Sequence, residues 1–86
     1  MPNIRQQEKR VRTAARERLE NLRYVSTVKT LTRRLRTAVE GGDGNEIATR
    51  HRELVRWIDR AAARGALHKN AAARKKAQAS RLVAGR

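Results

Sequence analysis

The chain has 86 residues, and its 22 Lys and Arg against 8 Asp and Glu give a formal net charge of +14. This length allows one domain at most, over residues 1–86, and so large a positive charge indicates an anionic partner. The absence of Cys excludes disulfides and thiolate metal sites. No apolar run approaches the roughly 20 residues that a membrane span needs, and no apolar signal-peptide core is present. We therefore expect a cytoplasmic protein without a membrane partner.

The apolar core should be thin. The chain has 7 Leu, 3 Ile and 6 Val residues, no Phe, and only Tyr24 and Trp57 as aromatic residues. This composition and charge border on those of disordered chains, and a short chain with a small core is marginally stable. We expect helices that need a partner to become fully ordered.

Glycines divide the chain into three helix-compatible segments, at about residues 4–40, 45–64 and 70–84. No stretch alternates polar and apolar residues with the period of a strand. Residues 41–44 (Gly-Gly-Asp-Gly) lack the Gly-Lys-Ser/Thr that completes a phosphate-binding P-loop, so we interpret them as a plain turn between helices. The chain is predicted to be all-α.

The first segment carries two stripes of residues on different faces. Its apolar residues mostly recur at steps of three and four, which predicts one apolar stripe facing one way. This stripe is sparse before Leu19 and dense after it. The second stripe is basic and consists of Arg5, Lys9, Arg12, Arg16 and Arg23.

The other two segments have recognisable ends. Asn45 is the predicted N-cap of the second helix, and Arg64 with Gly65 in a left-handed conformation would end it. The third segment is rich in Ala, which favours a helix, and could be capped by Asn70. It must fold back on the other two helices to bury its larger apolar groups, Leu82 and Val83, together with Leu67 of the preceding link.

The helix lengths differ enough to predict an overhang. At about 1.5 Å per residue, the first helix would be about 55 Å long and the second about 30 Å. Since the turn is short, the two should lie antiparallel, and residues 3–18 would overhang with six basic residues against two acids. The sequence thus predicts a three-helix bundle with a long, overhanging N-terminal helix.

The positive charge is concentrated toward the two ends of the chain. Residues 1–18 carry +4, residues 19–63 carry +3 and residues 64–86 carry +7. No Asp or Glu follows Arg64, so this last stretch has no acid of its own to neutralise it, and a phosphate backbone is the commonest partner that would. We expect a nearly balanced centre and two basic surfaces.

Catalytic chemistry finds little support. His51 and His68 are separated by a helix and have no neighbouring metal ligands. We expect no enzyme activity, no cofactor, no metal and no small-molecule substrate. His51, Tyr24 and Trp57 lie on or beside apolar stripes, so we interpret them as packing residues.

The link His68-Lys69-Asn70 allows two interpretations. At a helix start, free N–H groups and the positive end of the helix dipole attract phosphate. Lys69 adds a charge, and His68 and Asn70 can donate hydrogen bonds. The same residues could form a simple capped turn, and their types alone leave both possibilities open.

Several strings of residues match a known pattern over essentially the whole chain. They resemble the family of the bacterial small-subunit ribosomal protein numbered twenty, and the most specific of them is the last. The strings are Asn3-Ile4-Arg5, Lys9-Arg10-Val11-Arg12-Thr13-Ala14, Arg18-Leu19 with Asn21, Val28-Lys29-Thr30-Leu31, Ala38-Val39-Glu40-Gly41-Gly42-Asp43, and Asp59-Arg60-Ala61-Ala62 through Arg64-Gly65-Ala66-Leu67-His68-Lys69-Asn70-Ala71-Ala72-Ala73-Arg74-Lys75-Lys76.

The resemblance implies a three-helix bundle that is a structural constituent of the small ribosomal subunit. It implies direct binding to the 5′ domain and long penultimate helix of 16S ribosomal RNA, beside other subunit components, and bridging of RNA helices during assembly. The RNA contacts carried over are Asn3, Arg5, Lys9, Arg10, Arg12, Thr13, Arg18, Asn21, His68, Lys69, Asn70, Arg74, Lys75 and Lys76. The basic stripe and the acid-free C-terminal stretch add Arg16, Arg23, Arg64 and Arg81.

Two other functions compete with this one. Composition alone would permit a DNA-compacting nucleoid protein, and an amphipathic first segment could be membrane-active. Against the membrane hypothesis, the apolar stripe is sparse where the charge is greatest.

Because double-stranded RNA gives side chains poor access to base edges, we expect recognition through shape and phosphates.

Overall fold

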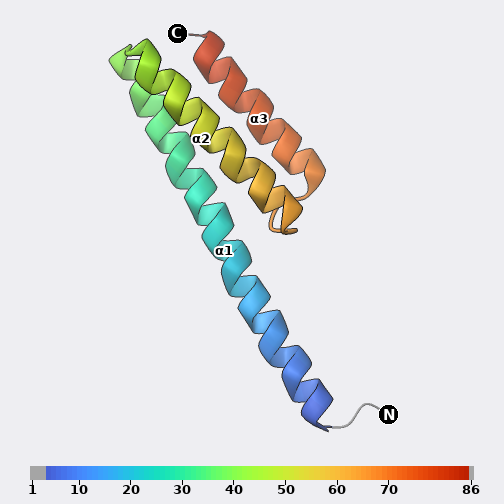
Figure 1. Ribbon diagram of the computed structural model, residues 1–86. Coiled ribbons are helices and arrows are strands. Elements are labelled where there is room, and N and C mark those ends of the chain that lie inside the picture. The colour runs from blue at the N-terminus through green and yellow to red at the C-terminus, as the bar shows by residue number, and fades with distance from the viewer. Residues whose placement is uncertain (1–3, 86) are drawn as a thin grey trace.

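The computed structural model describes residues 4–85 and consists of three helices. They are α1 (Ile4–Gly41), α2 (Gly44–Ala63) and α3 (Lys69–Ala84), and no strand occurs in the described part of the chain. Helix α2 runs back along α1, and α3 turns again to run beside α2 (Figure 1). The predicted all-α, three-helix architecture is confirmed.

Helix α1 extends far beyond the other two helices (Figure 1). The molecule measures 60 × 20 × 13 Å, and its long axis is about the length of a 38-residue helix. Every residue from 4 to 20 is exposed, and Asn21 is the first half-buried residue of α1. We call residues 4–20 the overhang; its presence confirms the prediction from helix lengths.

The core lies between the second half of α1 and the whole of α2. Helix α3 contributes only Ala72 and Ala79 to it, and these small side chains let its backbone approach the other helices closely. Around this core pack half-buried apolar residues that include Tyr24, Trp57, Leu67, Leu82 and Val83. The fully buried residues of α1 and α2 are Val28, Leu31, Leu35, Ala38, Ile47, Leu54, Ile58 and Ala61.

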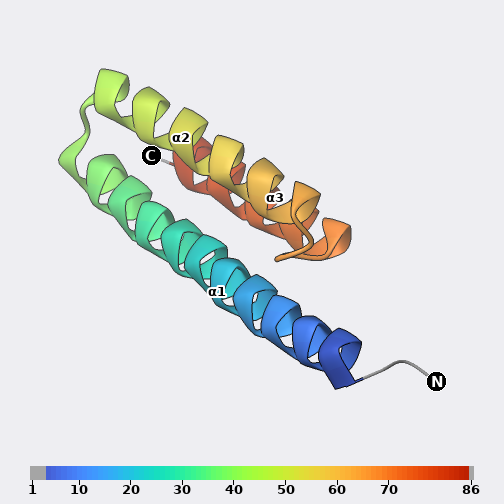
Figure 2. The ribbon, with the colours of Figure 1, turned by 60° about the horizontal axis from the view of Figure 1, so that its bottom comes forward.

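Helix α3 packs mainly on α2 and contacts α1 less extensively. In the turned view, α2 and α3 lie on the same side of α1, and the link between them lies at the end opposite the 41–44 turn (Figure 2). The predicted fold-back is therefore confirmed, but it is asymmetric. It leaves a seam between α1 and α3, which contact each other less than α2 and α3 do.

The spacing of the apolar residues predicted that they face one side of α1, and this prediction is wrong. From Leu19 to Leu31 they follow one another at steps of three residues, and each step falls about 60° short of a full turn. Four such steps rotate the stripe by about 240°, so it winds around the helix. Leu31 is only 4% exposed, whereas Leu19 and Leu22 are 53% and 58% exposed.

Glycines with positive φ end the first two helices. Gly42 has φ 77° after α1, and Gly65 has φ 79° after α2, both in the left-handed region. After α2, the N–H of Gly65 donates to the carbonyl of Ala62 and that of Ala66 donates to Ala61. This is the Schellman arrangement, so the predicted role of Gly65 is confirmed.

The N-caps differ from the predicted ones. Asp43 caps α2 in place of Asn45, since its carboxylate accepts from the N–H groups of Asn45 and Glu46. His68 caps α3 in place of Asn70, since its Nδ1 accepts from the Asn70 N–H at 3.1 Å. In both cases the cap lies two residues before the predicted one, and its side chain accepts from N–H groups two or three residues ahead.

Candidate nucleic-acid interface

The basic stripe of α1 is fully open to solvent. Its five residues, Arg5, Lys9, Arg12, Arg16 and Arg23, are all exposed. None of them forms an ion pair with another residue of the described range 4–85. Unpaired cations at helical spacing on an isolated rod can contact successive phosphates of a nucleic acid.

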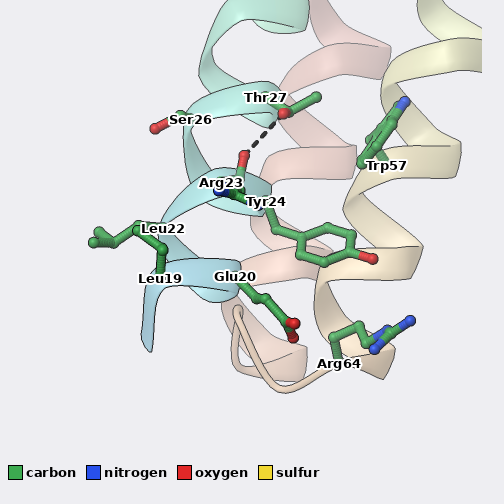
Figure 3. A pocket seen from close by; sticks show the side chains of 9 residues that line it. All are labelled: Leu19, Glu20, Leu22, Arg23, Tyr24, Ser26, Thr27, Trp57 and Arg64. Carbon is green, nitrogen blue, oxygen red and sulfur yellow. Dashed lines mark hydrogen bonds between the residues drawn. The ribbon is translucent and has the colours of Figure 1, made fainter. Parts of the chain in front are cut away.

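The stripe ends at a hollow of about 690 Å³ between α1 and α2 (Figure 3). Here the Tyr24 and Trp57 rings lie 5.6 Å apart at an angle of 53°, and the Arg60 guanidinium lies 5.4 Å from the Trp57 ring centre. These rings pack on each other, so they leave no parallel slot for a base. Figure 3 also shows Leu19 and Leu22 on the far side of α1 from the two rings. The interpretation of Tyr24 and Trp57 as packing residues is confirmed.

The link between α2 and α3 is exposed but already capped. His68, Lys69 and Asn70 are all exposed. Because His68 Nδ1 accepts the Asn70 N–H, that N–H is not free for a phosphate, and His68 acts as an acceptor there. The structure contains the capped turn, while phosphate binding at this link stays a prediction. The Lys69 and Asn70 side chains remain accessible beside it.

This link lies against the base of the overhang. Ala66 of the link lines a hollow of about 400 Å³ together with Arg18, Asn21 and other residues of α1. The fold therefore places one residue of the link beside two predicted contact residues of α1, Arg18 and Asn21. The other wall residues are Ala14, Glu17, Leu22 and Val25.

Lys75 and Lys76 are neighbours in sequence but lie on different sides of α3. Lys75 lines a groove toward α1, whereas Lys76 Nζ lies 2.9 Å from Asp59 Oδ1 of α2. The last stretch has no acid of its own, as its sequence shows, but Asp59 from outside this stretch pairs with Lys76. Asp59 lies 17 residues away, a separation that a count of nearby acids does not cover.

The centre of the bundle is not evenly balanced, although the residue count suggested it. Acids of α2 are used locally: Arg50 pairs with Glu46 and with Glu53, and Asp43 caps the helix. The cations on the part of α1 that lies beside α2 and α3 form no ion pair with an acid among the described residues. These cations are not among the predicted contact residues, although their spacing of four and three residues marks one helix face: Lys29, Arg33 and Arg36.

The structure places the predicted contact residues mainly on the surface. Asn3 lies outside the described residues. Half-buried members are Asn21, Lys75 and Lys76. Exposed members are Arg5, Lys9, Arg10, Arg12, Thr13, Arg16, Arg18, Arg23, Arg64, His68, Lys69, Asn70, Arg74 and Arg81.

The described residues offer little support for a metal site or a membrane-spanning helix. Within residues 4–85, no group of three or more His, Cys, Asp or Glu side chains could hold a metal ion. His51 is half-buried as expected, and its Nε2 is buried without a hydrogen-bond partner among the described residues. None of the described helices is long and apolar enough to cross a membrane.

Comparison with known proteins gives matches along nearly the whole chain. A family model for ribosomal protein S20 matches residues 2–84. Small ribosomal subunit protein bS20 of Kocuria rhizophila is 43% identical over 84 residues, covering 98% of each chain. The bS20 protein of Streptomyces griseus is 42% identical, covering 98% of this chain and 96% of the relative. That of Mycobacterium leprae is 41% identical and covers 96% of each.

Proposed function

The chain belongs to the ribosomal protein S20 family of the small ribosomal subunit, and we propose that it binds 16S ribosomal RNA directly and bridges RNA helices during subunit assembly. In this proposal, residues 1–86 act as one RNA-binding unit. The 5′ domain and the long penultimate helix of 16S RNA are the partner regions that the family resemblance implies.

The observation that carries the proposal is the overhang. It presents six Lys and Arg on a rod whose described residues are all exposed, and none of the six forms an ion pair within residues 4–85. Packing against the rest of the chain adds little to the stability of the overhang. A polyanion would supply the missing partner, and membership of a ribosomal protein family supports ribosomal RNA as that polyanion.

Binding would rest on phosphate contacts rather than on base recognition. Arg suits such contacts because its planar guanidinium can donate two parallel hydrogen bonds, and 17 of the 22 basic residues are Arg. Each neutralised phosphate releases counterions, so affinity should fall steeply with salt. The deep, narrow major groove of A-form RNA excludes side chains, which leaves shape and backbone as the recognised features.

Competition between RNA and DNA tests this proposal. The full chain is bound to a labelled transcript of the 16S 5′ domain and challenged with duplex DNA of equal phosphate concentration. We expect RNA to be retained at DNA concentrations well above its own. If DNA wins or ties, the nucleoid-protein alternative replaces the proposal.

A further inference from the structure

The seam between α1 and α3 forms a groove whose walls are basic. Its volume is about 330 Å³. Lys29, Arg33 and Arg36 of α1 line one wall, and Lys75 lines the other with Gln78. We call this feature the α1–α3 groove; Thr32, Leu54 and Ala79 complete its lining.

No acid opposes these cations. The lining contains four Lys and Arg and no Asp or Glu, and none of the four forms an ion pair within the described range. Lys29, Arg33 and Arg36 are exposed, and Lys75 is half-buried. Like charges gathered around one hollow raise its positive potential, and low-dielectric walls focus that potential on an anion.

The floor of the groove does not provide polar specificity. Leu54 and Ala79 are each about 1% exposed. The Thr32 hydroxyl already donates to the Val28 carbonyl at 2.8 Å. The groups that remain for a ligand are long cationic side chains spread over about 10 Å of α1, which suits a chain of phosphates better than one small anion.

The groove faces a different direction from the basic stripe. Positions 29, 33 and 36 lie about a third of a turn around α1 from positions 12, 16 and 23. One RNA backbone lying along the stripe would have to wind around the helix to enter the groove. A second RNA segment can occupy it without such a path.

We propose that the α1–α3 groove holds the phosphate backbone of a second RNA segment, separate from the segment contacted by the basic stripe. This proposal rests on the proposed function and adds the second arm that bridging requires. It also assigns binding to residues of the chain's centre: Lys29, Arg33 and Arg36.

A matched pair of double variants tests the groove. Arg33→Gln/Arg36→Gln removes two charges from it, and Arg52→Gln/Arg56→Gln removes two from the exposed outer face of α2. Gln keeps the helix propensity close to that of Arg. For binding to full-length 16S RNA, which holds both proposed partner regions, we expect the groove variant alone to reduce the slope of log affinity against log salt by about 2. Equal slopes for the two variants would contradict the proposal that the α1–α3 groove binds RNA.

A second pair tests the other wall. Lys75→Gln should reduce that slope by about 1, whereas Lys76→Gln, whose charge is met by Asp59, should change it less. Hydroxyl-radical footprinting should show that Arg33→Gln/Arg36→Gln loses protection of one RNA segment and keeps another. Loss of both segments together, or of neither, contradicts a separate second segment.

An overhang variant separates this inference from the proposed function. Arg5→Gln/Arg12→Gln/Arg16→Gln should weaken RNA binding whether or not the groove is used. If it does so while the groove variants bind like the unmodified chain, the groove proposal fails and the proposed function stands. If neither set weakens binding, both fail.

Discussion

The two halves of α1 both carry cations, but they differ in the density of their apolar residues and in their surroundings. Residues 4–20 are all exposed, whereas the half that faces α2 contains four buried residues and most of the core contributed by this helix. Both halves carry several cations and apolar residues at helical spacing. What separates them is the presence of a second helix, which reaches only half the length of the first.

One half of α1 therefore contributes to the stability of the fold, and the other half presents groups for binding. The packed half gains from apolar burial, at roughly 25 cal/mol per Å² of apolar surface removed from water. The overhang has no such gain and depends on helix propensity, which alone makes short helices marginal in water. Its cations are therefore available for RNA, and RNA would hold the overhang in its helical form.

Removal of a core side chain should have the largest effect on folding. Leu35 is fully buried between α1 and α2, so Leu35→Ala should lower the free energy of unfolding by about 2–5 kcal/mol. Leu22→Ala, in the same helix but 58% exposed, is the matched control and should cost less than about 0.5 kcal/mol. Urea unfolding followed by circular dichroism measures both. Equal losses would show that the two faces of α1 are equally packed.

Removal of the α3 cap should have an intermediate effect. His68→Ala takes away the acceptor of the Asn70 N–H and should cost about 1 kcal/mol. His68→Asn supplies another capping oxygen and should restore most of this stability. Thermal unfolding of the three proteins compares them. If His68→Ala unfolds like the unmodified chain, the cap contributes nothing to folding.

A glycine in the overhang should have the smallest effect on the cooperative transition. Ala15→Gly weakens helix propensity by about 1 kcal/mol at an exposed position that no other helix contacts. We expect the unfolding midpoint to stay the same, while hydrogen exchange of the amides around residue 15 becomes faster. A lowered midpoint would mean that the overhang unfolds together with the bundle.

Much of the fold could be predicted from the sequence because local signals agree with it. Glycines at 42 and 65 mark two helix ends, and the unequal lengths of the segments imply an overhang. The winding of the apolar stripe also has a local cause, a run of steps of three. It was missed because steps of three and four were treated as equivalent, although only their mixture keeps a stripe on one face.

The site was less predictable, because charge is balanced in space and not along the chain. Asp59 neutralises Lys76 across two helices, and the acids of α2 do not reach the cations of the α1–α3 groove. A net charge for residues 19–63 averages over these separate surfaces. Likewise, the choice of His68 over Asn70 as a cap depends on where the helix begins, and the residue types permit either.

The most direct test of the account is the salt dependence of RNA binding by the overhang variant Arg5→Gln/Arg12→Gln/Arg16→Gln. The three side chains lie outside the core, so urea unfolding should remain as in the unmodified chain. We predict that the slope of log affinity against log salt for the 16S 5′-domain transcript falls by about 3. An unchanged slope with unchanged affinity would contradict the assignment of the overhang to phosphate binding.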